Sequence, residues 1–257
     1  MKTEERPVSI FQAQHQGARE YQEDAFGLSD LEEDGRIPAK GYLAVLADGM
    51  GGLSYGHMAS HTAVDTFLKE HSVRSHEESA ASFLTRALRI SNVSVFDKAY
   101  QDGEEVELGT TLVAALIEQN DLYWTSVGDS CVFHYREGKL EQLNQEHVYG
   151  NQLEEQVMKG EISREEAERH PEREHLTSYL GLPEIPEVDG NNDPLVLKTN
   201  DRIVLCSDGL SGVLTEMEMK DILDNCHHDP ATEMIRQVLG KEARHQDNVT
   251  VIIIEIG

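Results

Sequence analysis

Short apolar runs alternate with polar turns over much of this chain, a pattern typical of β-strands. Several runs are apolar on consecutive residues, as in Leu43-Ala44-Val45-Leu46-Ala47, which indicates strands covered on both faces. The polar residues 118–121 join two such runs and predict an antiparallel hairpin. The predicted strands span residues 41–47, 111–117, 122–127, 131–135, 202–206 and 249–256.

Helical periodicity lies between the first and second of these strands. Ala59, Ala63 and Phe67 recur at every fourth position, and a similar pattern follows further along the chain. The two patterns predict an antiparallel helix pair on one sheet face, and two later helical stretches would cover the opposite side. The four stretches lie near residues 59–68, 83–99, 216–223 and 231–239.

Residues 151–174 differ from the rest of the chain because they are densely charged with both signs. Ser163-Arg164-Glu165-Glu166 matches a capping box, and His170-Pro171 predicts the end of the helix that it opens. We interpret this segment as a solvated helical insertion.

Composition limits the partners that the chain can bind. A net charge of −26 over 257 residues disfavours nucleic acid and anionic membrane surfaces. No apolar stretch of membrane-spanning length occurs, and the charged N-terminal residues resemble no signal peptide. Cys131, Cys206 and Cys226 are odd in number and fit reduced thiols. We expect a cytoplasmic, monomeric protein with one domain over residues 1–257.

Acidic residues recur next to the ends of the apolar runs. Asp48 and Asp208 each end a predicted strand and precede a glycine, while Glu23 and Asp247 belong to two further acidic clusters. Carboxylates gathered in one pocket repel each other and are costly to bury unpaired. A fold that brings these residues together must therefore bind a cation there. Since no Cys-rich or paired-His ligand set accompanies them, we expect Mg²⁺ or Mn²⁺, with the Gly49 carbonyl as a further oxygen ligand.

Asp-Gly is also an ordinary turn signal, and the pairs beginning at Asp34, Asp102 and Asp189 lie in polar loops and are interpreted as turns. Asp129 fits a turn and a metal ligand equally well. Arg19 alone is typical of a surface residue, but beside a carboxylate cluster that holds metal it fits a phosphoryl substrate.

Six motifs carry a family resemblance through their order and spacing. They are Arg19…Glu23-Asp24-Ala25, Asp48-Gly49-Met50-Gly51-Gly52, Gly109-Thr110-Thr111, Val127-Gly128-Asp129-Ser130, Ser207-Asp208-Gly209-Leu210 and Asp247-Asn248. The ordered set resembles the PPM family of metal-dependent protein serine/threonine phosphatases, the type 2C class, over about residues 8–256. The resemblance implies an α+β fold, a four-layer α-β-β-α sandwich of two antiparallel sheets flanked by helix pairs. It also implies a bacterial-type helical flap at about residues 147–181.

The resemblance further implies a metal centre with two or three divalent ions, Mn²⁺ or Mg²⁺. Arg19 and Asp48 are the implied catalytic residues, with Arg19 binding the substrate phosphate and Asp48 bridging two ions. The remaining implied ligands are Glu23 and the Gly49 carbonyl on one ion, Asp208 and Asp247 on the other, Asp24 through a bound water, and Asp129 with Asp208 at a weaker third site.

Three positions depart from the family pattern. Met50 stands where many eukaryotic members have a histidine that is a proposed general acid, and a thioether cannot donate a proton. Cys131 replaces a common arginine, and His57 replaces a common glutamate. The source of the leaving-group proton is therefore open.

The function that the resemblance implies is hydrolysis of phosphoserine and phosphothreonine on proteins, in opposition to a serine/threonine kinase. Direct attack by a hydroxide that bridges the ions needs no covalent phosphoenzyme, which agrees with the lack of a Cys-x5-Arg loop. One alternative is a catalytically silent pseudophosphatase that binds phosphoproteins. Another is a two-metal nuclease, which the acidic composition disfavours.

Overall fold

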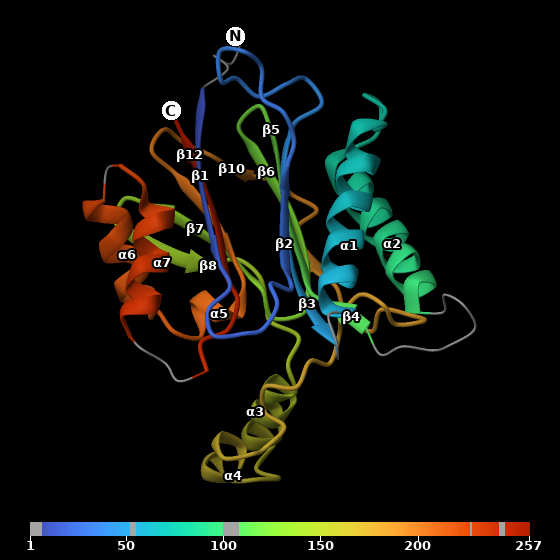
Figure 1. Cartoon of the computed structure of the whole chain (residues 1–257), viewed down its shortest axis with the longest axis vertical. Helices are drawn as coiled ribbons and strands as arrows, with labels where there is room; N and C mark the ends of the chain where they lie inside the picture. The colour runs from blue at the N-terminus through green and yellow to red at the C-terminus, as the bar shows by residue number, and fades with distance from the viewer. Residues whose placement is uncertain (1–6, 52–54, 100–107, 227, 242–244) are drawn as a thin grey trace.

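Two antiparallel β-sheets lie face to face, and helices cover the outer face of each (Figure 1). The computed structural model describes residues 7–51, 55–99, 108–226, 228–241 and 245–257. The arrangement confirms the predicted α+β fold, a four-layer α-β-β-α sandwich. Gly52 of the second motif and the predicted turn at Asp102-Gly103 lie outside the described residues.

The first sheet has the strand order β10-β6-β5-β3-β2, with β4 paired to β3 and β9 paired to β6. Glu118 pairs with Asp121 where β5 turns into β6, which confirms the predicted hairpin. The strands are β2 (Asp24–Leu28), β3 (Tyr42–Gly51), β4 (Leu108–Thr110), β5 (Leu112–Glu118), β6 (Asp121–Val127), β9 (Asp189–Gly190) and β10 (Leu195–Val196).

The second sheet has the order β1-β12-β11-β7-β8. Its strands are β1 (Val8–His15), β7 (Cys131–Arg136), β8 (Lys139–Gln142), β11 (Arg202–Cys206) and β12 (Val249–Ile256). The sequence patterns did not predict β1 and β2, and these two strands flank the loop that carries Arg19 and Glu23.

Helices α1 (Tyr55–Ser72) and α2 (Ala80–Ala99) cover the first sheet. They pack on each other through Phe67 and Phe83, whose ring centroids lie 5.8 Å apart. Helices α5 (Asp208–Ser211), α6 (Glu216–Asn225) and α7 (Pro230–Gly240) cover the second sheet. All four predicted helical stretches are therefore confirmed.

Consecutive apolar residues in β3 serve two separate cores. Leu43 and Val45 pack under α1 and α2, whereas Ala44 and Leu46 pack between the two sheets. Because successive side chains of a strand point to opposite faces, a strand in the middle of a layered fold must be apolar on both. A third core lies between the second sheet and the helices α5 to α7.

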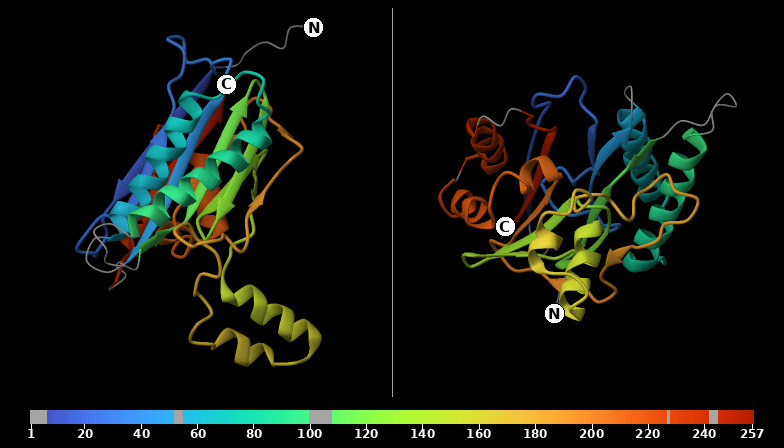
Figure 2. Two further views of the ribbon diagram at one scale, coloured as in Figure 1. Left: turned by 90° about the vertical axis from the view of Figure 1, so that its right-hand side faces the viewer. Right: turned by 90° about the horizontal axis from the view of Figure 1, so that it is seen from below.

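The charged segment forms two helices that project from one end of the sandwich (Figures 1 and 2). Helix α3 (Tyr149–Lys159) ends at Gly160, which has a left-handed φ of 75°. Helix α4 (Arg164–Glu168) begins at the predicted capping box of Ser163 and Glu166. An isolated bridge from Val148 to Leu176 pairs the two ends of this insertion, and a bridge from Thr110 of β4 to Leu180 joins it to the sandwich. None of the described helices is both long and apolar enough to span a bilayer.

Candidate metal centre

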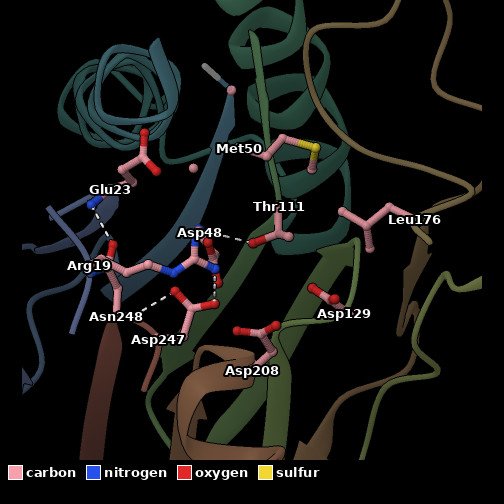
Figure 3. Close-up of a pocket in the computed structure, with 12 residues that line it drawn as sticks. Arg19, Glu23, Asp48, Met50, Thr111, Asp129, Leu176, Asp208, Asp247 and Asn248 are labelled. Atoms are coloured by element: carbon pink, nitrogen blue, oxygen red, sulfur yellow. Dashed lines mark hydrogen bonds and ion pairs between the residues drawn. The ribbon is translucent and has the colours of Figure 1, made fainter. Parts of the chain in front are cut away.

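A cavity of about 250 Å³ opens at the end of the sheets from which α3 and α4 project (Figure 3). Seven of the eight residues predicted for the site line it, and Asp24 is the exception. Met50, Gly51, Thr111, Leu176 and Asn248 complete the lining. The cavity therefore gathers acidic residues from segments that are far apart in the sequence.

Asp48 lies inside a strand, which corrects the prediction that it ends one. Strand β3 continues to Gly51 because Gly49 pairs with Thr110 of β4. The backbone N–H of Asp48 donates to Thr111 Oγ1 at 2.9 Å, and its carbonyl accepts from Thr110 Oγ1 at 2.8 Å. The two threonines thus fix the backbone from which the Asp48 carboxylate enters the cavity.

Glu23 is held against the first turn of α1 by a close approach of two glycines. The Gly49 N–H donates to the Glu23 carbonyl at 3.2 Å. A Cβ atom on Gly56 would lie 2.6 Å from Glu23 Oε1 and 2.8 Å from the Gly49 carbonyl oxygen. Since side chains do not tolerate such contacts, only glycine fits at position 56 without a shift of its neighbours.

Asn248 ties the loop between β1 and β2 to the site. Its side-chain amide donates to the Gln16 carbonyl at 2.8 Å and to the Tyr21 carbonyl at 3.0 Å, while its Oδ1 accepts from the Glu23 N–H at 2.7 Å. Sequence reasoning included Asn248 in a motif but gave it no role. Its three bonds to a loop more than 200 residues away could be found only in the folded chain.

Arg19 forms an ion pair with Asp247, one of the residues expected to bind metal (Figure 3). Its guanidinium group stays about half exposed at the mouth of the cavity. An exposed ion pair is weak, so the group can exchange partners at a low cost in free energy.

Asp24 lies behind the cavity and is almost fully buried. Its Oδ2 accepts from Thr250 Oγ1 at 2.6 Å and from Ser207 Oγ at 2.9 Å, and these bonds tie β2 to β12 and to the N-cap of α5. The structure therefore does not bring Asp24 into the cavity with the other predicted ligands.

Burial and mutual repulsion dominate the electrostatics of the site. Burial, and then the neighbouring Asp24 and Asp208, raise the pKa of Asp48 well above its usual range. Burial and Asp208 raise the pKa of Asp129 to about 7, with smaller contributions from Glu146 and Glu174. A bound cation would reverse this balance because it stabilises the charged carboxylates.

Unpartnered oxygen atoms indicate what the cavity can hold. Within the described part of the chain, Glu23 Oε1, Asp24 Oδ1 and Asp208 Oδ1 are buried and accept no hydrogen bond. Among these residues, no group of three Asp, Glu, His or Cys side chains is close enough together to coordinate a metal ion as it stands. The carboxylates are spread over the wall of the cavity. An all-oxygen donor set fits a hard divalent ion, and small side-chain movements are needed to close on it.

Fold and site together define a hydrolase of the metal-dependent phosphatase type. A profile of the protein phosphatase 2C family matches residues 11–247. The chain is 30% identical to the serine/threonine phosphatase stp of Listeria welshimeri, over 92% of this chain and 91% of that protein. The chain therefore belongs to the protein phosphatase 2C family, which confirms both the predicted family and the predicted enzyme class.

Solved structures agree with this assignment. The serine/threonine phosphatase of S. agalactiae superposes with a TM-score of 0.80 at 24% identity, over 97% of this chain and all of that one, and this supports the fold. The catalytic domain of the phosphatase PstP, in complex with two manganese ions, superposes with a TM-score of 0.70 at 25% identity, over 97% and 98% of the two chains. The family is metal-dependent.

Proposed function

We propose that this protein removes phosphate from phosphoserine and phosphothreonine of proteins, using divalent ions held in the carboxylate cavity. The observation that carries the proposal is the convergence of seven predicted site residues on one cavity, together with buried carboxylate oxygens that lack a partner. The names of the related phosphatases support the substrate class.

We assign Glu23, Asp48 and the Gly49 carbonyl as ligands of one ion, and Asp48, Asp208 and Asp247 as ligands of the other. We assign Asp129 to a third, weaker site with Asp208, and Asp24 to an indirect role through water. When bound, Mn²⁺ or Mg²⁺ ions lower the pKa of water and stabilise negative charge on phosphoryl oxygens.

Arg19 binds the phosphate in this proposal. Its planar guanidinium can donate two parallel hydrogen bonds to phosphate oxygens, and it reaches the mouth of the cavity from the β1–β2 loop. It must first leave Asp247. Met50 lines the cavity but carries no titratable proton, so the proton for the leaving alkoxide comes from water or from another group.

The physiological setting follows from the same proposal. Phosphorylated proteins are the substrates, a serine/threonine kinase supplies them, and the enzyme works as a cytoplasmic monomer with one catalytic domain over residues 1–257. The helices α3 and α4 belong to a flap over about residues 147–181, and Leu176 of this segment lines the cavity.

One experiment separates this function from the two alternatives. The enzyme is titrated with Mn²⁺ in the presence of a phosphothreonine peptide and, in parallel, an oligonucleotide. We expect phosphate release from the peptide that saturates with Mn²⁺, and no cleavage of the oligonucleotide. Peptide binding without phosphate release would favour a silent phosphoprotein binder, and cleavage of the oligonucleotide would favour a nuclease.

A further inference from the structure

A second cavity, of about 600 Å³, adjoins the metal centre. Asp129 and Asp208 line both cavities, so the two spaces share a wall. Figure 3 shows these residues on the side of the metal centre away from Glu23. The second cavity is therefore within reach of a peptide whose phosphorylated side chain enters the first.

The lining of this second cavity is both acidic and apolar. Beyond the two shared aspartates, Glu146, Glu174 and Glu216 contribute carboxylates. Phe133, Leu214 and Met219 contribute an apolar wall. No Lys, Arg or His lines this cavity within the described ranges of the chain. The space therefore suits a ligand with an apolar stem and a cationic end.

Glu146 is held in place by neutral donors. Gln142 Nε2 donates to Glu146 Oε1 at 3.2 Å, and the Cys131 thiol contacts the same oxygen at 3.4 Å. Neither donor carries a positive charge, and no salt bridge to Glu146 occurs among the residues that the structure describes. Its two neutral partners orient the Glu146 carboxylate, and a cationic group of a ligand can pair with it.

Glu174 stands on the segment that returns from α4 and is largely exposed. Its cationic neighbour, Arg173 Nε, lies 3.7 Å away and also bonds Glu154. A contact that long and exposed is weak, so it leaves Glu174 able to pair with an incoming cation.

We propose that this cavity receives a Lys or Arg side chain of the substrate that lies within a few residues of the phosphorylated position. The aliphatic stem packs on Phe133 and Met219, and the cationic end reaches Glu146 and Glu174. The inference rests on the proposed function because it assumes a phosphopeptide in the metal centre. It makes the enzyme selective for phosphorylation sites next to basic residues.

The charge of the molecule favours this ligand over others. A net charge of −26 repels acidic peptides and attracts basic ones at long range. Long-range attraction alone would not depend on any single glutamate, whereas a side chain seated in the cavity depends on Glu146. The test therefore compares peptides of different charge on enzyme variants with single charge changes.

The experiment measures kcat/KM on phosphothreonine peptides of one length at a fixed ionic strength and saturating Mn²⁺. A single Ala, Lys or Glu is placed in turn at each position from three before to three after the phosphothreonine. We expect Lys to exceed Ala about fivefold at one or more positions, the upper range for a partly exposed ion pair. Glu146→Gln should abolish this preference, while kcat/KM for the Ala peptide stays within about twofold of wild type.

The matched control is Glu165→Gln, which removes the same charge from the exposed face of α4, where Glu165 pairs with Arg169. It should retain the full Lys preference. Glu146→Lys should reverse the preference towards Glu peptides, which shows a local effect even if the Gln variant loses some stability.

Three outcomes would overturn the inference and leave the proposed function intact: hydrolysis with no Lys preference at any position, a Lys preference that survives in Glu146→Gln, or one that disappears when Mn²⁺ is raised tenfold at constant ionic strength. The last would mean that the cavity takes a free ion. If no peptide released phosphate, the proposed function itself would be refuted.

Discussion

At Gly56, the first turn of α1 lies against Glu23 and Gly49, so a methyl group there tests how the fold positions the ligands. In Gly56→Ala the new Cβ would lie 2.6 Å from Glu23 Oε1 and 2.8 Å from the Gly49 carbonyl oxygen. These are the two groups that we assign to the same ion. We expect both to move, and the concentration of Mn²⁺ that gives half-maximal activity to rise about tenfold or more, equivalent to about 1.4 kcal/mol.

Two opposing effects act on stability in this variant. Alanine favours a helix over glycine by at most about 1 kcal/mol, and overpacking costs about 1–3 kcal/mol. The free energy of unfolding should therefore fall by no more than about 3 kcal/mol, less than the stability of a typical domain, so the protein stays folded while metal binding weakens. Denaturant unfolding and Mn²⁺-dependent peptide hydrolysis measure the two effects separately.

The control is Gly240→Ala at the last residue of α7, where no atom lies within 4 Å of the added Cβ. This variant should keep the Mn²⁺ requirement of the wild type and gain up to about 1 kcal/mol of stability. If Gly56→Ala also keeps the wild-type Mn²⁺ requirement and kcat, then the close approach of α1 does not position the ligands, and our assignment of Glu23 and Gly49 is wrong.

Three further predictions follow from other residues of the structure. Asp48→Asn should reduce kcat more than Asp129→Asn at saturating Mn²⁺, since we assign the first residue to two ions and the second only to the weaker site; the reverse order in folded variants would refute this assignment. Arg19→Ala should lower kcat/KM for phosphopeptides about ten- to a hundredfold through loss of a charge-assisted contact. Calorimetry should show Mn²⁺ binding that is unchanged or tighter, because the change also frees Asp247 from its ion pair, and weaker binding would contradict the role of Arg19. Burial, followed by the nearby charges of Lys40 and Arg74, lowers the pKa of His71 to about 4, so the unfolded chain takes up a proton first as the pH falls below about 6.5. Urea unfolding should therefore show that the wild type loses about 2 kcal/mol more than His71→Gln between pH 7 and pH 5, and equal losses would refute the neutral buried imidazole.

The strands in the middle of the layers could be predicted because they carry apolar side chains on both faces, one towards each neighbouring layer. Strand β3 is apolar on consecutive residues since Leu43 faces a helix and Leu46 faces the other sheet. Strand β1 gives no such signal: it lies at a sheet edge, several of its residues are polar or exposed, and its partner is β12 at the other end of the chain. Its pairing of Val8 with Ile256 is fixed by tertiary structure.

The site could be predicted as a set of residues but not as a geometry. The ordered motifs identified the residues that line the cavity, since each motif has its own local pattern. The prediction that a strand ends at Asp48 was wrong, because pairing between β3 and β4 extends β3 to Gly51. The Arg19–Asp247 ion pair and the contact of Gly56 with Glu23 join segments that are distant in sequence, so no local pattern could reveal them.

The central claim is that the carboxylate cavity acts through divalent ions, and one measurement tests it most directly. Phosphate release from a phosphothreonine peptide is followed after exhaustive chelation, with the metal content of the protein verified, and again after Mn²⁺ is added back. Our account predicts no release from the metal-free protein and full recovery with Mn²⁺. Undiminished release from protein that contains no metal would contradict it.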